Sequence, residues 1–290
     1  MTPLPKPFPV PVVSSLVGPG SHDDESADFL PLPKDMATWQ PPPLPEPEQL
    51  AAHAGCLQVL QQALLALQAL GSAGAAAAPR VVPLDHLADA DRQLLNQVLG
   101  EGEVAAQVLG DDGLRVQESV FAGVWRVLQL QGGQVVRDTL EVGALPQGLL
   151  DAAAADAPRG GARFAAAPEG VMNAPALLAE LADRSLRWQP GVPSHVVNLT
   201  LLPLSPADSA HLDAQLPAGR VLILSRGYGN CRITNLGLAH AWRVTYFNST
   251  DINILDTLEI GPVPEVACAA VEDLQDSAER LAEVLDWVSQ

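Results

Sequence analysis

The stretch "GVWRVLQLQGGQVVRDTLEVGALP", from Gly123 to Pro146, has a close counterpart, "HAWRVTYFNSTDINILDTLEIGPVP", from His240 to Pro264. In each stretch, two runs rich in aliphatic and aromatic residues flank a polar turn, which is the pattern of a β-hairpin. The first run of each contains Trp-Arg-Val, and the second contains Asp-Thr-Leu-Glu. The same hairpin is therefore encoded twice in one chain.

The similarity extends upstream of the two hairpins. At an offset of 117 residues, nine of 29 positions are identical between 99–127 and 216–244. After one added residue, six of nine are identical between 138–146 and 256–264. We expect a tandem duplication of one α+β unit of roughly 100 residues, an ordinary domain size. Two such copies form a pseudo-symmetric pair with a groove or a shared sheet between them, which is a natural place for a partner.

Hydrophobic periodicity predicts the other elements of each copy. Trp125 and Trp242 occupy the same position in the two copies, so we expect them to be equivalent core anchors. Asp85 and Ser205 are predicted helix N-caps, and Pro264 is predicted to lie in the first turn of the closing helix. The expected strands lie near 81–83, 103–109, 114–120, 123–130, 135–142, 195–202, 220–226, 231–237, 240–248 and 252–260, and helices are expected from Glu48 to Leu70, from Asp85 to Gly100, at 175–188, after Ser205 and from Pro264 onward.

The predicted fold class is α+β, a tandem duplication of a helix plus antiparallel-sheet unit with an extended Pro-rich N-terminal tail. The first 47 residues hold 13 of the 26 prolines, which leaves few backbone donors for regular structure. The predicted domains are this extended segment at 1–47, a first α+β repeat at 48–150, an Ala/Gly/Pro linker at 151–174 and a second α+β repeat at 175–290.

Composition limits the classes of partner. The formal net charge of −18, from 34 acidic and 16 basic residues, predicts no nucleic-acid partner, because phosphates would be repelled. The apolar stretches are too short to cross a bilayer, so no direct membrane insertion is expected. The proline-rich start does not resemble a signal peptide, and three cysteines without a CxxC pair fit a reducing compartment. We therefore expect a cytoplasmic protein.

The polar residues form no recognisable reaction centre. The six histidines occur in no HxH, HxxxH or HExxH spacing, which predicts no preassembled metal site. There is no phosphate-binding glycine loop with its lysine, and no GxSxG nucleophile elbow. We therefore predict no catalytic residue, no metal, no cofactor and no enzymatic activity.

One turn differs sharply between the copies. The second copy has "RGYGNCR" at 226–232, where the first has the plain turn "LGDDGLR" at 109–115, so the fold does not require the unusual residues of the second. Arginine and tyrosine dominate protein recognition, and glycines let an incoming chain approach closely. Two interpretations stay open: a protein-binding loop, or a tight hairpin whose polar residues satisfy one another.

Two cysteines lie in the second copy, Cys231 and Cys268. They are either small buried residues or thiols that contact a metal or an iron-sulfur cluster. Stable cluster binding usually needs four protein ligands, which favours the first interpretation.

Long phrases of the chain resemble the HupH/HoxQ family of hydrogenase expression and maturation proteins. They are "FPVPVV", "LPLPKDM", "VQESVFAGVWRV", "LSRGYGNCRI", "VTYFNSTDINILDTLEI" and "VPEVACAAVEDLQDSAERL". The resemblance implies a cytoplasmic accessory protein that acts on the iron-sulfur small subunit of uptake [NiFe] hydrogenases before twin-arginine export, with a thioredoxin-like partner. The family residues carried over by position are Arg226, Gly227, Tyr228, Gly229, Asn230, Cys231, Asn248, Cys268, Phe8 and Met36.

The leading hypothesis is a binding module, a non-catalytic chaperone that holds the [NiFe] hydrogenase small subunit precursor. Its candidate binding residues are those just named, apart from Cys268. The alternative is a thiol-based iron-sulfur cluster carrier or assembly scaffold, in which Cys231 and Cys268 contact the cluster and the client completes the ligand set.

Overall fold

The computed structural model describes residues 45, 47–73, 79–157, 163–227 and 229–288. The predicted tail anchors Phe8 and Met36 lie outside the described residues, and so does Tyr228 of the unusual turn. The expectation of an extended tail at 1–47 also falls almost wholly outside them.

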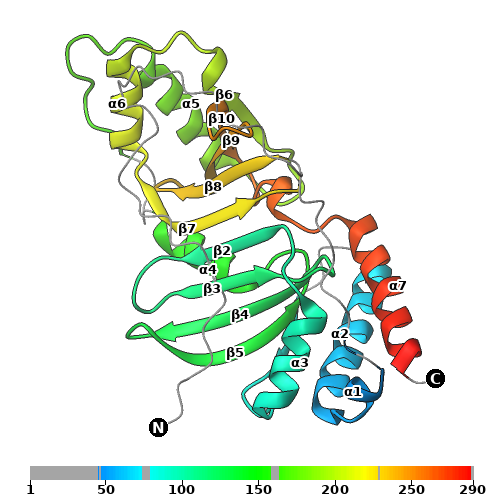
Figure 1. Cartoon of the computed structure of the whole chain (residues 1–290). Helices are drawn as coiled ribbons and strands as arrows, with labels where there is room; N and C mark the ends of the chain where they lie inside the picture. The colour runs from blue at the N-terminus through cyan, green and yellow to red at the C-terminus, as the bar shows by residue number, and fades with distance from the viewer. Residues whose placement is uncertain (1–44, 46, 74–78, 158–162, 228, 289–290) are drawn as a thin grey trace, which may run out of the picture.

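The described residues build one antiparallel sheet of ten strands in the order β1-β5-β4-β3-β2-β7-β8-β9-β10-β6 (Figure 1). The chain is therefore α+β, and the two copies contribute to one continuous sheet. The strands are β1 (Arg80–Pro83), β2 (Val104–Val108), β3 (Leu114–Glu118), β4 (Val124–Gln131), β5 (Gln134–Val142), β6 (His195–Asn198), β7 (Ala218–Ser225), β8 (Asn230–Leu236), β9 (Ala241–Phe247) and β10 (Asn253–Ile260).

The two halves of the sheet have the same strand order. Read outward from the centre, the first half runs β2-β3-β4-β5-β1 and the second runs β7-β8-β9-β10-β6. The halves meet where β2 pairs with β7, and Ala106 lies opposite Ile223, its own counterpart at the offset of 117. The pairs on either side of it, Val104 with Ser225 and Val108 with Val221, exchange equivalent positions of the two copies, as a two-fold axis through the central pair requires.

Different helices cover the two faces of the sheet: α2 and α3 and, in the second half, α5 and α6 cover one face, and α4 lies on the other. In β4, Val124 belongs to a core with α2 and α3, whereas its neighbour Trp125 faces the opposite side, toward α4. In the second half, Ala241 packs with α5 and α6, and Trp242 shares the cluster of Trp125. The helices are α1 (Pro47–Ala51), α2 (Ala54–Ala73), α3 (Asp89–Leu99), α4 (Gln147–Asp156), α5 (Ala174–Arg187), α6 (Pro206–Gln215) and α7 (Val271–Val288), with short 3-10 turns η1 (Leu199–Leu201) and η2 (Glu265–Ala267).

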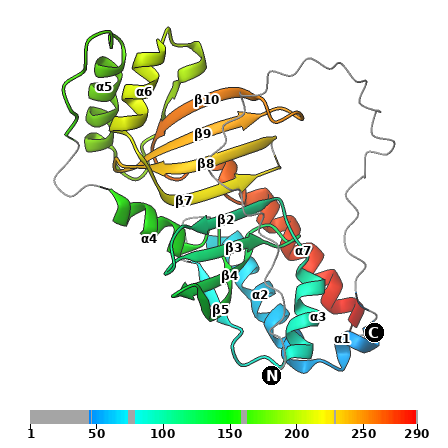
Figure 2. The same ribbon diagram turned by 60° about the vertical axis from the view of Figure 1, so that its left-hand side comes forward.

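Each copy sends its last helix onto the other copy. The helix α4 follows the strands of the first copy but packs against β7 and β8 of the second (Figure 2). Its final residue, Asp156, accepts hydrogen bonds from Arg220 and Asn235 of the second copy, which lower its pKa although burial alone would raise it. In return, α7 packs along α2 of the first copy, where Leu274 and Leu281 are buried. The copies are therefore interlinked by packing.

Several paired details recur in both copies. Trp125 and Trp242 are both buried, in one hydrophobic cluster, as expected for equivalent core anchors. Arg126 forms a buried ion pair with Asp138, and their counterparts in the second copy form the Arg243–Asp256 pair, whose Nη2–Oδ2 distance is 2.6 Å. Because each guanidinium meets its carboxylate through two nitrogens, these pairs fix β4 to β5 and β9 to β10.

Some predicted boundaries are wrong. Asp85 is not the N-cap of α3, since that helix begins at Asp89 after Ala88, and Asp85 instead accepts a hydrogen bond from the backbone N–H of Asp138. Pro264 does not begin the closing helix: the turn η2 follows it, and α7 begins only at Val271.

Two further predictions need correction. The single helix expected from Glu48 divides into α1 and α2, with a break at 52–53. The first residues of the predicted linker 151–174 are helical, because α4 continues to Asp156. The prediction at Ser205 is confirmed, since its side chain accepts from the backbone N–H of Asp208 and completes a capping box.

Candidate functional site

The unusual turn lies at one end of the sheet. Strand β7 ends at Ser225 and β8 begins at Asn230, so the described residues between them, Arg226, Gly227 and Gly229, lie at a hairpin tip. The β9–β10 turn, 248–252, lies beside it, because antiparallel pairing brings Asn230 opposite Phe247. We call these two turns the second-copy hairpin end. The corresponding first-copy turns lie at the opposite end of the sheet, since β2 and β7 run antiparallel.

The described residues of this hairpin tip are exposed, and one of them, Gly229, has a positive φ. Arg226 and Asn230 are exposed, and the backbone N–H of Arg226 donates to the carbonyl of Glu103 over 3.1 Å. Gly229 has φ +100 and open space around it, so its lack of a side chain serves backbone conformation. A Cβ on Gly227 would lie 2.1 Å from Oε2 of Glu103, which a flexible carboxylate can avoid.

Asn248 organises the neighbouring turn. Its side-chain oxygen accepts from the backbone N–H and the hydroxyl of Thr250 and from the backbone N–H of Ile252, at 2.8 to 2.9 Å. This Asx-type arrangement explains why an asparagine stands at the end of β9. Ile252 in this turn and Ile254 at the start of β10 are 58% and 56% exposed. Asn248 therefore shapes an apolar tip.

The structure brings Cys231 and Cys268 into one hydrophobic cluster, whereas Cys56 lies in another. All three cysteines are free. Burial is the largest influence on Cys268, and with the nearby carboxylates of Glu265 and Glu118 it raises the pKa to about 11. Burial also raises the pKa of Cys231. Both thiols are therefore protonated at neutral pH, whereas metal ligation requires thiolates. Within the described residues, no three His, Cys, Asp or Glu side chains are grouped to hold a metal.

Glu118 is a buried acid that the sequence reasoning missed. It is 6% exposed at the end of β3 and accepts a hydrogen bond from the backbone N–H of Gly123 over 3.2 Å. Burial, reinforced by the charges of Glu103 and Asp273, raises its pKa to about 7. In the repeat alignment, Glu118 corresponds to Asn235, which is neutral. This difference in charge between equivalent positions is the sequence signal that points to Glu118.

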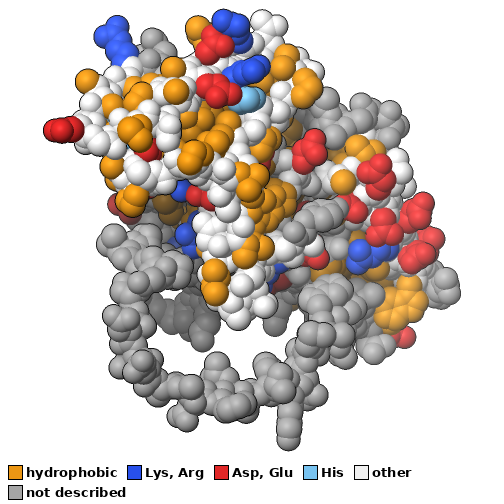
Figure 3. All heavy atoms as spheres, turned by 90° about the horizontal axis from the view of Figure 1, so that it is seen from above, with side chains coloured by type: hydrophobic (Ala, Val, Ile, Leu, Met, Phe, Trp, Pro, Cys, Tyr) orange, Lys and Arg blue, Asp and Glu red, His pale blue; other side chains and the backbone are white. Residues whose placement is uncertain are grey.

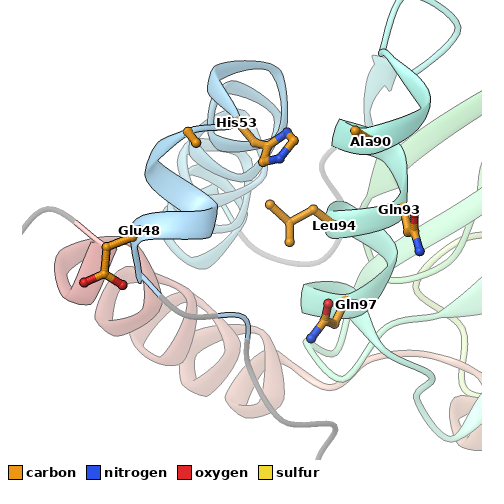
Figure 4. Close-up of a pocket in the computed structure, with 7 residues that line it drawn as sticks. Glu48, His53, Ala90, Gln93, Leu94 and Gln97 are labelled. Atoms are coloured by element: carbon orange, nitrogen blue, oxygen red, sulfur yellow. The ribbon is translucent and has the colours of Figure 1, made fainter.

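A second polar feature lies between α1 and α3, around a pocket of roughly 530 Å³ (Figure 4). His53 holds its Nδ1 2.7 Å from Oδ1 of Asp91, and Leu94 extends from α3 into the space between the helices. The remaining lining residues are Glu48, Ala52, Ala90, Gln93 and Gln97. A histidine–carboxylate pair can orient a general base, but this lining supplies no hydroxyl or thiol nucleophile. The pair joins α3 to the start of α2.

The surface is divided between apolar and acidic regions. Figure 3 shows hydrophobic side chains gathered over the half that carries α5 and α6, and acidic side chains on the side where α7 lies. Among the exposed apolar residues of the second copy, Leu186 is 83% exposed and Leu201 is 79% exposed. The outward face of α7 carries the exposed residues Glu272, Asp273, Asp276, Glu279, Glu283 and Asp286. None of the described helices is both long and apolar enough to span a bilayer.

Comparison with known proteins gives a consistent result. The chain matches the C-terminal conserved region of the HupH hydrogenase expression protein twice, over 55–167 and over 171–288. It is 52% identical to the hydrogenase expression/formation protein HoxQ of Cupriavidus necator, over 97% of this chain and 98% of that one. It is 44% identical to HupH of Rhodobacter capsulatus, over 93% and 95% of the two chains. The hydrogenase-1 operon protein HyaF of Escherichia coli is 34% identical over 95% of this chain and 96% of its own.

A solved structure of the hydrogenase expression protein HupH from Thiobacillus denitrificans is also similar, at 25% identity and a TM-score of 0.36, over 41% of this chain and 97% of that one. The double match over 55–167 and 171–288 agrees with the repeat and suggests a tandem duplication. The chain belongs to the HupH family of hydrogenase expression proteins.

Proposed function

We propose that this protein is a non-catalytic chaperone of hydrogenase maturation, which binds the immature iron-sulfur small subunit of an uptake [NiFe] hydrogenase in the cytoplasm before twin-arginine export. In this proposal a thioredoxin-like maturation protein acts beside it, and the scaffold is a tandem duplication whose second copy binds the client. The names of its relatives, hydrogenase expression/formation proteins, support the hydrogenase part of the proposal.

The observation that carries the proposal is the second-copy hairpin end. It combines the exposed Arg226 with the exposed Ile252 and Ile254 of the neighbouring turn and the start of β10, and Gly229 gives the Arg226 turn a positive φ of +100. An exposed arginine and exposed aliphatic side chains at one end of a sheet are a composition typical of protein-binding surfaces. The first copy has Leu109 at the position of Arg226, so the scaffold itself does not require the arginine.

Charge supports the same proposal. The segment 175–290 carries a net charge of −7, and six exposed carboxylates of α7 face solvent. Because an export signal begins with basic residues, this surface would attract it and raise the encounter rate. If the client binds equally well without its signal segment and at high salt, this part of the proposal is wrong.

The test of client binding uses position-matched variants. Arg226→Ala is expected to reduce co-purification of the small-subunit precursor about tenfold or more, as loss of an interface arginine does. Leu109→Ala changes the equivalent position of the first copy, at the opposite end of the sheet, and should leave co-purification unchanged. Equal yields from the two variants would contradict a binding role for the second-copy hairpin end.

A thiol-based cluster carrier is the second candidate, and one observation favours it: Cys231 and Cys268 share one cluster of the structure. The raised pKa of each thiol is a cost for this candidate, because both must lose a proton to ligate iron. Replacing both cysteines by alanine separates the candidates. A chaperone should still bring the client down and support its maturation, whereas a carrier should lose iron in the complex and fail to mature it.

A further inference from the structure

The strands β1 and β6 are the two outer edges of the ten-stranded sheet. Each pairs with the last strand of its own copy in the same register, because Val81 lies opposite Glu141 and Val196 lies opposite Glu259, the counterpart of Glu141 at the offset of 118. The two edge strands therefore occupy equivalent positions. Their sequences differ at both ends: β1 reads RVVP and β6 reads HVVN.

The first-copy edge is closed to a further strand. The backbone N–H of Leu84 donates to the carbonyl of Asp138 on β5 over 2.9 Å. Because backbone groups point to alternate sides along a strand, Val81 and Pro83 of β1 point away from β5, toward the outside of the sheet. Proline has no N–H to donate, and the exposed Arg80 adds a charge at the same edge. Both features prevent edge-to-edge pairing in natural sheets.

A matching pair of hydrogen bonds shows that β6 has the same orientation as β1. The backbone N–H of Asp138 donates to Oδ1 of Asp85 over 3.1 Å, and the N–H of its counterpart Asp256 donates to Oγ1 of Thr200 over 2.9 Å. Asp85 and Thr200 each lie two residues beyond the end of their edge strand. The residues that point outward from β6 are therefore its second and its fourth.

The second-copy edge lacks both protecting features. Its fourth residue is Asn198, which keeps a backbone N–H where Pro83 has none, and its first residue is His195 in place of Arg80. Its second residue, Val196, is 53% exposed. The edge of β6 therefore presents the outward N–H groups and carbonyls of Val196 and Asn198 to another strand.

The segment that carries β6 is apolar and uncharged. Residues 188–207 contain no Asp, Glu, Lys or Arg, although the whole chain has a net charge of −18. Within this segment the exposed side chains include Val192, Val196, Leu201 and Leu202, on the half of the molecule over which apolar side chains gather in Figure 3. Two copies of an acidic chain repel each other, and an uncharged edge is where this repulsion is weakest.

We propose that β6 pairs with β6 of a second copy of this chain, antiparallel and across a two-fold axis, so that the sheets of two chains join edge to edge. The two repeats within one chain already join in this way, through β2 and β7. With Val196 opposite its own equivalent, each Val196 N–H donates to the carbonyl of the other, and the flanking apolar side chains are covered. The closed edge at β1 stops the assembly at two chains. This interface does not depend on the client of the proposed function.

The test measures the mass of the full-length protein by size-exclusion chromatography with light scattering, over a series of concentrations. We expect the mass of two chains, falling toward that of one chain on dilution. Val196→Lys places two like charges opposite each other and should weaken the dimer about tenfold or more. Val81→Lys is the matched control on the closed edge; it alters a valine that is 51% exposed and should leave the dimer unchanged.

A second variant tests the backbone pairing. Asn198→Pro installs the residue of the first-copy edge at a position whose φ of −87 lies near the proline value of about −65. Because the N–H of Asn198 points outward, the substitution removes no bond to β10 and should also weaken the dimer about tenfold or more. Urea unfolding shows whether each variant folds, and Val196→Lys, at an exposed position, decides the question even if Asn198→Pro does not.

A protein that is monomeric at every concentration would overturn the proposal, and so would a dimer that Val196→Lys weakens no more than Val81→Lys does. In cells that produce the hydrogenase, a photoreactive residue at position 196 should crosslink two copies of this chain. A crosslink to a hydrogenase subunit alone would make a client strand the occupant of this edge and overturn the proposal. The mass measurement contains no hydrogenase protein, so its failure would leave the test of Arg226 untouched.

Discussion

Replacing Glu118 with glutamine should remove a pH dependence of stability that the fold creates. The pKa of Glu118 is raised from 4.5 to about 7, mainly by burial, with Glu103 and Asp273 as its nearby charges. A carboxyl group with a raised folded pKa contributes stability below its unfolded pKa and loses that contribution as pH rises through the folded value. Between pH 5 and pH 8, linkage gives a loss of about 2 to 3 kcal/mol from this one group.

The second copy shows why glutamine suits the position. Its counterpart, Asn235, is a neutral amide that accepts from the backbone N–H of Val221 over 2.9 Å. Glu118→Gln keeps the acceptor and cannot ionise, so the variant should gain about 2 to 3 kcal/mol over the unaltered protein at pH 8 and little at pH 5.

The assay is urea unfolding of the full chain, followed at both pH values, with Glu101→Gln as the control because Glu101 is exposed. The difference between variant and unaltered protein should grow with pH for Glu118→Gln only. A difference that is the same at pH 5 and pH 8 would refute the assignment of a raised pKa to Glu118.

Three further predictions concern the thiol of Cys268, the carboxylate of Asp208 and the backbone of Gly229. The thiol of Cys268 should react with a disulfide reagent at pH 8 far more slowly than a free cysteine, because its pKa is raised to about 11; a rate equal to that of free cysteine would contradict its burial. Asp208→Ala should lower the urea midpoint more than Asp213→Ala does, since Asp208 accepts the backbone N–H groups of 172–174 at the start of α5; equal midpoints would mean that these bonds contribute little. Gly229→Ala should cost about 1 kcal/mol through backbone strain at φ +100, and unchanged unfolding would show that the turn relaxes freely.

Features set by short-range chemistry could be predicted from the sequence. The capping box at Ser205 needs only residues three apart, and the β4–β5 hairpin needs only alternation and a Gly-Gly turn. The repeat also predicted that Trp125 and Trp242 would be equivalent core residues, because aligned positions of a duplicated unit share their packing.

Features set by long-range packing could not be predicted. The helix α4 lies partly in a run of alanines that shows no amphipathic period, although alanine is the best helix former. The crossing of α4 and α7 between copies depends on which surfaces are left uncovered, and periodicity carries no such information. The pairing of β2 with β7 could not be predicted either, because no pattern within one strand shows which edge strand of the other half it will pair with.

The candidate binding residues differ in how far they reach the surface, and their role in binding stays a prediction. Arg226 and Asn230 are exposed as a binding turn requires, but Asn248 uses its side chain to shape its own turn, and Cys231 is buried beneath the surface. Glu118 was missed because a lone carboxylate in a strand is usually solvated, and only its alignment with Asn235 reveals the difference between the copies.

Photo-crosslinking in cells that produce the hydrogenase tests client binding by the second copy most directly. A photoreactive residue is placed at position 226 in one variant and at its first-copy equivalent, position 109, in another; both positions are exposed. We expect a crosslink to the small-subunit precursor from position 226 and none from position 109. Crosslinks of equal yield from both positions, or from neither, would show that the second-copy hairpin end does not hold the client.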